Sequence, residues 1–325
     1  MNKLKQIGKR VAFILLLLII FIFVNNSSMF TKVSVQEPLL LAHRGLAQTF
    51  PMDGITGDTC TAERINEPEH PYIENTIPSM KAAFEAGADV VELDVHPTMD
   101  GEFAVFHDWT LECRTNGTGV TREQTMEELK KLDIGYGYTA DHGKTYPFRG
   151  KGVGLMPTLD EVLNTFPDKN FLIHIKSDDP SEGELLAQYL EKFPKDQLEQ
   201  LSVYGGNQPI DTLNRQIPTL RVMSKQTMKS CLIPYLAVGW TGYVPTACEN
   251  TQLHVPETIA KWLWGYPGKF LNRMEDANTR IILVKGDGSW SEGFDQVEDL
   301  ESLPEKYTGG IWTNRIDVIA PVIRE

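Results

Sequence analysis

The sequence has too little positive charge for a nucleic-acid-binding protein. Its 325 residues include 31 Lys and Arg against 44 Asp and Glu, which gives a net charge of −13. The first thirty residues contribute four cations and no acid to that total, so the rest of the chain is near −17. Nucleic-acid-binding proteins hold the phosphate backbone with clustered Lys and Arg. We therefore expect no nucleic-acid partner, and an anionic ligand would need a local positive feature such as a metal ion.

Cysteine is scarce, and the four that are present lack the spacing of a zinc motif. They are Cys60, Cys113, Cys231 and Cys248. An even number of cysteines in an exported protein is typical of disulfide bonds. Of the three possible pairings, the order along the chain favours Cys60 with Cys113 and Cys231 with Cys248. Four unpaired, buried thiols are the alternative.

The N-terminal segment, residues 1–30, lacks acidic residues and an Ala-x-Ala cleavage signal. Basic residues precede residues 11–24, which have no polar side chain. That run is short for a bilayer core, which takes about 20 residues, and it has the length of the apolar part of a signal peptide. We expect an uncleaved membrane anchor, with a cleaved signal as the alternative. Because basic flanks stay inside, the body is expected outside the cytoplasm, either anchored to the cell membrane by a single span or secreted.

Strand-like and helix-like runs alternate through the rest of the chain. Strands are expected at residues 39–42, 90–95, 171–176, 201–204, 220–223, 252–255, 281–284 and 310–313. Helices are expected at residues 77–86, 158–166, 184–193 and 294–303. Eight strands with mostly helical connections predict an α/β fold, a TIM-type (β/α)8 barrel that fills one domain over residues 31–325. A doubly wound open sheet is the alternative.

One connection between strands is expected to be a β-hairpin instead of a helix. Asp100-Gly101 separates two strand-like runs, which is a strong signal for a two-residue turn. Counting outward from that turn places Asp94 opposite His107, and Glu92 shares the face of Asp94. The hairpin would therefore gather two carboxylates and an imidazole in one small volume.

These polar residues have the chemistry of a phosphate site. Two carboxylates on one strand face repel, and a hard divalent cation relieves that repulsion; a solvated pair on an outward face is the alternative. His43 and His107 follow strand ends and titrate near neutrality, so they suit a base and an acid. Arg44 offers a two-pronged contact to phosphate oxygens. Lys176 shares a strand face with His174 and would neutralise phosphate charge.

The order of these residues resembles the glycerophosphodiester phosphodiesterase family. The similar segments are His43-Arg44-Gly45, Glu74-Asn75-Thr76, Glu92-Leu93-Asp94-Val95, Asp100-Gly101, His107-Asp108, and residues 116–119, 157–163 and 310–313. The resemblance is dense over residues 39–176 and thin afterwards. It implies a TIM barrel with a divalent metal ion, Ca²⁺ or Mg²⁺. The implied reaction is hydrolysis of a glycerophosphodiester to glycerol 3-phosphate and an alcohol.

The resemblance also implies roles for individual residues. The acid/base pair would be His43 and His107, and the metal ligands Glu92 and Asp94. Phosphate would be bound by Arg44 and Lys176, with Glu74 in support. His174 stands where the family usually has a glutamate as third metal ligand, which favours Zn²⁺ or Mn²⁺.

Two features leave the substrate open. The loop at residues 46–73 is long for the family and is expected over the barrel mouth, where it would influence substrate choice. Together with the anchor, it keeps a lysophospholipid or a glycerol-phosphate polymer as alternative substrates. Because of His174, a non-catalytic barrel that binds an anionic ligand is the remaining alternative.

Overall fold

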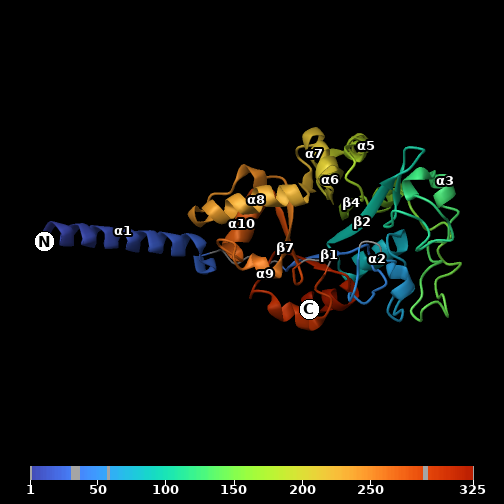
Figure 1. The fold of residues 1–325 in the computed structure, drawn as a ribbon, viewed down its shortest axis with the longest axis horizontal. Coiled ribbons are helices and arrows are strands. Elements are labelled where there is room, and N and C mark those ends of the chain that lie inside the picture. Colours follow the sequence, from blue (N-terminus) through green and yellow to red (C-terminus); the bar gives the residue numbers. More distant parts are fainter. Residues whose placement is uncertain (1, 31–36, 57–58, 288–291, 325) are drawn as a thin grey trace.

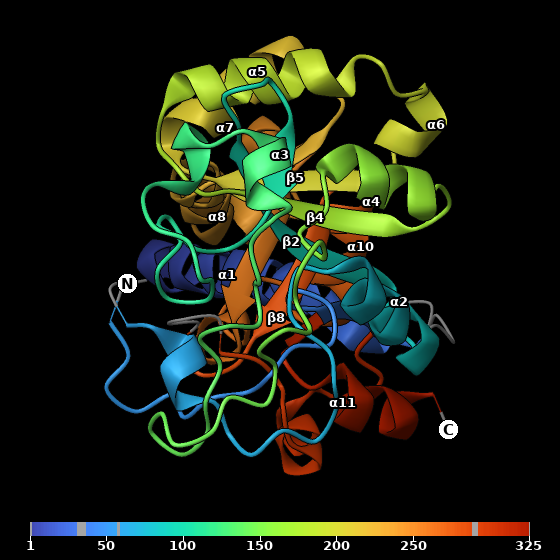
Figure 2. The same ribbon diagram turned by 90° about the vertical axis from the view of Figure 1, so that its right-hand side faces the viewer.

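The computed structural model, which describes residues 2–30, 37–56, 59–287 and 292–324, contains a nearly closed barrel of eight parallel strands (Figures 1 and 2). They are β1 (Leu39–Ala42), β2 (Val90–Pro97), β4 (Asn170–Ile175), β5 (Leu201–Gly205), β6 (Arg221–Met223), β7 (Gln252–Pro256), β8 (Arg280–Val284) and β9 (Gly310–Thr313). Their order is β6-β5-β4-β2-β1-β9-β8-β7. A bridge between Val222 and Thr251 joins the two ends of this order. The predicted barrel is confirmed, and the open doubly wound sheet is wrong.

Alternation along the strands separates the outer core from the barrel interior. On β2, Val91, Leu93 and Val95 point outward and pack in the main core beneath the helices. Val90 points inward to a smaller apolar cluster that includes Leu172 and Trp312. The inward positions after Val90 hold the polar residues of β2. The end of the barrel towards which the strands run therefore carries these polar side chains, above the apolar cluster.

The predicted hairpin is present, but its turn is one residue longer than expected. The backbone N–H of Thr98 donates to the carbonyl of Glu102 at 2.9 Å, which leaves three residues in the turn. Gly101, the last of the three, has a φ of 82°. A three-residue turn that ends in a left-handed residue is a common hairpin connection, and glycine adopts that φ without strain.

The longer turn shifts the register of the hairpin. β3 (Phe103–Val105) pairs antiparallel with the end of β2, and Val95 lies opposite Val105. The N–H of Phe106 donates to the carbonyl of Asp94 at 3.0 Å. The predicted pairing of Asp94 with His107 is therefore wrong, because β3 has ended before His107. His107 comes from the loop that follows.

Helices cover the outside of the barrel (Figure 2). They are α2 (Ile77–Ala86), α3 (Met126–Leu129), α4 (Leu159–Thr165), α5 (Pro180–Leu190), α6 (Lys195–Leu198), α7 (Asn207–Gln216), α8 (Lys225–Val238), α9 (Glu257–Ala260), α10 (Gly268–Asp276) and α11 (Ile316–Ile323). The expected helices at 77–86 and 158–166 are confirmed. The helix expected at 184–193 begins earlier, as α5, because Asp179 caps it and Pro180 follows. The segment expected as a helix at 294–303 is the 3₁₀ helix η7 (Val297–Ser302).

Two long loops share a second hydrophobic core beside the barrel. The loop after β1 contributes Ala62, Ile65 and Ile73, and the connection between β3 and β4 contributes residues such as Phe106 and Tyr138. This connection also contains α3 and the 3₁₀ helix η3 (Thr121–Glu123). In Figure 1 it lies at the end of the molecule opposite α1. The two loops therefore pack against each other and share this core.

The N-terminal segment forms one long helix, α1 (Asn2–Asn26), that projects from the body (Figure 1). Within α1, Lys5–Asn26 has 22 residues and a mean hydropathy of 2.6, and its apolar window is not buried against the rest of the protein. At 1.5 Å per residue, this length covers the ~30 Å of a bilayer core, so the helix is longer than its apolar run suggested. A signal sequence has the same character. The predicted boundary at residues 30 and 31 falls partly outside the described residues.

Candidate active site

A pocket of about 640 Å³ opens where the polar strand ends meet the two long loops. Its lining includes His43, Arg44, His107, His174 and Lys176. Loop residues such as Phe50, Ile55 and Trp109 form other parts of its wall. The loop at 46–73 therefore lies over the barrel mouth, as expected. The structure brings both predicted acid/base histidines and both predicted phosphate-binding cations into one pocket.

Asp94 is fully buried and has charged or polar partners on both oxygens. Oδ1 lies 2.9 Å from His174 Nδ1 and 3.2 Å from Lys176 Nζ. Oδ2 accepts a hydrogen bond from Asn75 Nδ2 at 2.9 Å and lies 3.2 Å from Arg44 Nε. Burial acts to raise the pKa of Asp94, but the two cations outweigh it and hold that pKa well below its ordinary value. Asp94 is therefore a carboxylate at neutral pH.

Glu92 is also fully buried, but its partners are weaker. Tyr204 OH donates to Oε1 at 2.7 Å, and the backbone N–H of Arg44 donates to Oε2 at 3.2 Å. Burial, with Asp94 close by, raises the pKa of Glu92 to about 8. Without a further cation, the carboxylate pair holds a proton at neutral pH. A divalent ion would take the place of that proton.

The residues present fit a divalent metal ion. Glu92, Asp94 and His174 each offer a ligand atom, and these atoms lie within 4.8 Å of one another. Two carboxylates and one imidazole are a donor set that several divalent ions accept. The three predicted metal ligands are therefore together. The half-buried His174 ring stacks on Tyr204 at a centroid distance of 4.0 Å, which fixes its plane.

Arg44 is held between two acids, and Glu74 lies behind it. Arg44 NH1 donates to Glu74 Oε1 at 3.0 Å, while Arg44 Nε faces Asp94. Arg114 Nε lies 3.4 Å from the same Glu74 oxygen. Glu74 is buried and is absent from the lining of the pocket, whereas Arg44 reaches it. Glu74 thus orients the Arg44 guanidinium, and its part in substrate binding stays a prediction.

His43 is held in one tautomer by Asn314, which follows β9, and by Asp295, which precedes η7. Asn314 Nδ2 donates to Asp295 Oδ2 at 2.9 Å, and this turns Asn314 Oδ1 towards the His43 ring. His43 Nδ1 lies 2.6 Å from that oxygen, so Nδ1 carries the proton and donates it. Burial and the neighbouring Arg44 hold the pKa of His43 well below its ordinary value. His43 is therefore neutral, with an unprotonated Nε2 that lies 3.8 Å from Glu92.

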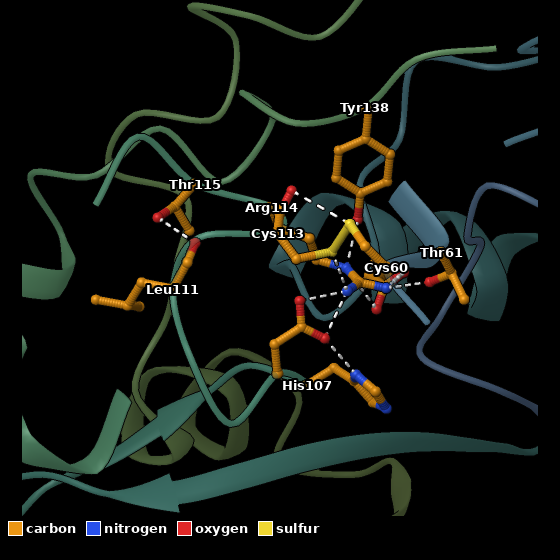
Figure 3. The surroundings of a disulfide bond; sticks show 10 residues. Cys60, Thr61, His107, Leu111, Cys113, Arg114, Thr115 and Tyr138 are labelled. Carbon is orange, nitrogen blue, oxygen red and sulfur yellow. Dashed lines mark hydrogen bonds and ion pairs between the residues drawn. A yellow bond between two sulfur atoms is a disulfide. The ribbon is translucent and has the colours of Figure 1, made fainter. Parts of the chain in front are cut away.

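His107 has a charged partner where His43 has a neutral amide. His107 Nδ1 donates to Asp108 Oδ1 at 2.7 Å. Arg114 NH1 in turn donates to both Asp108 oxygens, and Arg114 NH2 donates to Thr61 Oγ1 at 2.6 Å (Figure 3). Burial and Arg44 hold the pKa of His107 below its ordinary value, although Asp94 and Asp108 act to raise it. Among the two histidines, His107 is the one with a carboxylate placed to stabilise an imidazolium.

The Cys60–Cys113 disulfide joins the two long loops beside this network (Figure 3). Thr61 and Arg114, which hydrogen-bond one another, directly follow its two cysteines in the chain. The second disulfide is Cys231–Cys248. The pairing favoured by the order along the chain is the one present. The first disulfide therefore fixes the loop that carries Asp108 and Arg114, and through them His107.

Replacing Cys60 and Cys113 together by serine is expected to lower both stability and turnover. The loop closed by this disulfide spans 53 residues, so its loss costs up to about 4 kcal/mol of unfolding free energy in the chain-entropy model. Turnover should fall as well, because Arg114 loses the fixed position that holds Asp108. The matched control replaces Cys231 and Cys248, which close a loop of 17 residues away from the pocket. Thermal unfolding should register both changes, and kcat only the first; equal kcat losses would contradict this role.

Several residues of the site were not given roles by the sequence. Asn75 and Asp108 lie within quoted motifs, next to residues that were assigned. Asn314 directly follows the strand expected at 310–313, as His43 follows the strand expected at 39–42. That position could have marked Asn314 as a residue of the site. Tyr204 is the last residue of an expected strand. Arg114 carries no local signal, because its contacts come from a loop that approaches from elsewhere in the chain.

Comparison with known proteins gives similarities in sequence and in fold. The model of the glycerophosphoryl diester phosphodiesterase family matches residues 43–226. A glycerophosphodiester phosphodiesterase from Caldanaerobacter subterraneus subsp. tengcongensis is 37% identical over 140 residues, which is 43% of this chain and 45% of that protein. This chain thus matches less than half the length of that curated relative. Residues 43–226, which the family model matches, contain His43, Glu92, Asp94, His107 and His174 but not Asp295 or Asn314.

Solved structures resemble nearly the whole chain. A glycerophosphodiester phosphodiesterase from Agrobacterium tumefaciens has a TM-score of 0.58 at 20% identity, over 89% of this chain and 100% of that one. An Oleispira antarctica phosphodiesterase, solved in complex with the product sn-glycerol-3-phosphate, has a TM-score of 0.54 at 17% identity, over 89% and 98% of the two chains. At these identities the likeness shows a shared barrel fold.

Proposed function

Because the chain belongs to the glycerophosphoryl diester phosphodiesterase family, we propose that it is a metal-dependent hydrolase of glycerophosphodiesters. The products would be glycerol 3-phosphate and an alcohol. The observation that carries the proposal is the pair His43 and His107, whose Nδ1 atoms are both bonded to fixed acceptors in one pocket. Such a pair leaves both Nε2 atoms free for proton transfer. The Oleispira antarctica phosphodiesterase, which was solved with sn-glycerol-3-phosphate, supports this substrate class.

The two histidines differ in a way that assigns their roles. His43 is neutral because its partner is an amide, so its Nε2 accepts the proton of the attacking hydroxyl group. His107 pairs with the carboxylate of Asp108, which favours the charged ring. A bound phosphodiester adds negative charge to the pocket and favours that form further. His107 then donates its proton to the leaving oxygen. The attacking group would be a hydroxyl of the substrate next to the phosphate, so the alcohol leaves and a cyclic glycerol phosphate remains. Water would then open this ring to give glycerol 3-phosphate, with His107 as the base and His43 as the acid.

The charges of the site suit a metal ion and a phosphodiester together. The network contains Arg44, Arg114 and Lys176 against Glu74, Glu92, Asp94 and Asp108. With neutral histidines and with Glu92 protonated, its net charge is zero. A divalent ion held by Glu92, Asp94 and His174 changes this charge to +1, and a phosphodiester anion then brings it to zero. Such an ion supplies stabilisation for charge on phosphoryl oxygens.

Arg44 and Lys176 would bind the phosphate oxygens. Both line the pocket, and both contact Asp94, which fixes their charged ends beside the carboxylate pair. The planar Arg44 guanidinium is additionally fixed by Glu74 and can contact two oxygens at once. A substrate phosphate held there would lie near both histidines. These cations position the diester and take no part in moving protons.

The proposal is tested by release of glycerol 3-phosphate from glycerophosphocholine, measured with several divalent ions and with a chelator. Turnover that requires a divalent ion is the expected result. Absence of hydrolysis across diesters and ions, with the ion bound, would favour the non-catalytic, anion-binding barrel. Metal content of the purified protein gives a second readout that does not depend on activity.

Apolar residues in the wall of the pocket favour a second candidate substrate. Phe50, Ile55 and Trp109 line a pocket of about 640 Å³, and the Trp109 side chain is 45% exposed. Such a wall would contact the acyl chain of a lysophospholipid better than a choline head group alone. Comparison of glycerophosphocholine, lysophosphatidylcholine and a glycerol-phosphate polymer by kcat/KM separates these substrates.

We also propose that α1 anchors the protein in the cell membrane and that residues 31–325 form one extracytoplasmic barrel domain. The basic residues that precede the apolar run would stay on the cytoplasmic side. The presence of two disulfides agrees with an oxidising compartment for the body. Release from membranes by detergent but not by carbonate or high salt is the expected behaviour, and a shortened, soluble mature chain would contradict it.

Replacing Asn314 by alanine is expected to lower kcat about 10–100-fold, the usual loss when the partner that orients a functional histidine is removed. Without the amide oxygen, the proton of His43 is free to move to Nε2, and the base is then lost in that fraction of molecules. KM should change little, because Asn314 is not among the pocket-lining residues. Asp295→Asn is the companion variant, since it acts on His43 only through Asn314. A change in KM without a change in kcat would contradict the positioning role.

A further inference from the structure

A surface segment away from the pocket has no charge at all. Residues 230–248 contain no acidic or basic residue and no histidine over nineteen positions. They comprise the end of α8 and the 3₁₀ helices η4 (Gly239–Thr241) and η5 (Thr246–Cys248). The Cys231–Cys248 disulfide joins the two ends of this segment. We refer to it as the 230–248 segment.

Large apolar side chains of the 230–248 segment face solvent. The exposed fractions are 63% for Ile233, 42% for Leu236, 36% for Val238 and 57% for Tyr243. Single exposed apolar residues are common, but a cluster on an uncharged surface segment marks a site of interaction. The neighbouring helix α1 indicates what this surface contacts.

The end of α1 is attached to the 230–248 segment. Asn25 Nδ2 and Asn26 Nδ2 donate to the carbonyl of Trp240 at 3.0 Å and 2.9 Å. The ring of Phe21 meets the edge of the Trp240 ring at a centroid distance of 6.5 Å. Arg273 on α10 donates to the carbonyl of Asn25 at 2.8 Å. Figure 1 shows α8 and α10 beside the inner end of α1. The last turn of α1 and the 230–248 segment therefore lie side by side, and both would be at the same depth relative to a membrane that contains α1.

We propose that the 230–248 segment rests on the lipid bilayer and forms a second membrane contact beside α1. The inference depends on α1 remaining in the membrane. The apolar run of α1 ends at Val24, so the bilayer surface would lie near Trp240. Trp and Tyr favour this interfacial layer, and aliphatic side chains such as Ile233 enter the layer beneath it. The contact would fix the orientation of the body, which a single helix leaves free to rotate.

This orientation has a consequence for the substrate. Figures 1 and 2 place α3 and the loops of residues 107–157 at the end of the molecule opposite α1. Residues 107–110 of these loops line the pocket. With the 230–248 segment on the bilayer, the pocket wall lies far from the lipid surface. The arrangement favours a diester that arrives from solution over a lipid from the same membrane.

The test uses the full-length protein in nanodiscs that contain a photoreactive phosphatidylcholine with its diazirine near the glycerol backbone. After illumination, lipid adducts are mapped by mass spectrometry of peptides. We expect adducts on α1 and on the 230–248 segment. In Leu236→Asp, adducts on the segment should fall at least tenfold while those on α1 persist. The matched control is Leu185→Asp on α5, where Leu185 is 44% exposed, and its adduct pattern should equal that of the wild type.

Each contrary result has a distinct meaning. Adducts on α1 without adducts on the 230–248 segment would overturn the inference and leave the anchor intact. Adducts on neither would overturn both the anchor and the inference. Two protein copies per disc, with the segment covered by protein and free of lipid, would overturn it in favour of a dimer contact. Circular dichroism and the thermal midpoint of both variants show that a lost adduct does not come from unfolding. None of these readouts depends on enzymatic activity.

Discussion

Replacing His43 or His107 by alanine is expected to lower kcat for glycerophosphocholine by about 10²–10⁴-fold, the contribution of one positioned acid or base. Each variant removes an imidazole whose Nε2 has an assigned proton transfer: from the attacking hydroxyl for His43, and to the leaving oxygen for His107. The two losses should differ with the leaving group. A diester with an acidic leaving group, such as a nitrophenol, departs as an anion and needs no proton from His107. It should restore much of the activity of His107→Ala and none of that of His43→Ala.

The matched control is His142→Ala, because His142 is an exposed loop histidine outside the pocket lining. Its kcat on both substrates should equal that of the wild type. Rescue of His43→Ala by the acidic leaving group, in place of His107→Ala, would reverse the assigned roles. Equal insensitivity of both variants to the leaving group would remove the acid/base assignment altogether. Near-UV circular dichroism of all three variants excludes a loss of fold as the cause.

The barrel could be predicted from the sequence because the strands are short and mostly apolar, and most of them are followed by a polar residue. All eight predicted strands agree with the observed ones to within two residues. In a parallel barrel, the strand ends meet at one mouth, so His43 and Lys176 were placed together by topology alone. The same logic applies to Asn314 after β9. Alternation on β2 also placed Glu92 and Asp94 on one face, and their burial shows that it is not the solvated outward face kept as the alternative.

The parts that could not be predicted depend on contacts between distant segments. The register of the hairpin turned on a single left-handed residue, Gly101, and one added turn residue moved His107 off the strand. His107 still reaches the pocket, because Asp108 and Arg114 hold it from the loop. That loop is fixed by the Cys60–Cys113 disulfide and by a second core. The order of the cysteines indicated this pair, but it did not indicate where in the fold the loop would lie. His107 thus lies in the expected pocket, but the loop places it there and not a strand pairing with Asp94.

Removal of the proposed metal ion is also expected to have a large effect. Chelation is expected to reduce turnover about 100-fold or more, because the ion supplies several kcal/mol of charge stabilisation. Saturation with a preferred ion should also stabilise the folded protein, by about 2.7 kcal/mol at a hundred times its Kd. Glu92→Gln should lose both effects, since the amide cannot carry the charge that the ion neutralises. The thermal midpoint, measured with and without each ion, gives a readout that is independent of catalysis.

The choice of ion is expected to depend on His174, the third proposed ligand. Imidazole favours Zn²⁺ or Mn²⁺, whereas a carboxylate in its place favours Ca²⁺ or Mg²⁺. His174→Glu is therefore expected to raise the affinity for Ca²⁺ relative to Zn²⁺, and His174→Gln is the control that removes the imidazole without adding charge. The ratio of the two dissociation constants, from titration calorimetry, measures the change. If the ratio is the same in the wild type and in both variants, His174 is not a ligand, and its contact with Asp94 would serve only to orient that carboxylate. If the preference for Zn²⁺ falls in His174→Gln and falls further in His174→Glu, the imidazole is a ligand and the three residues form the metal site.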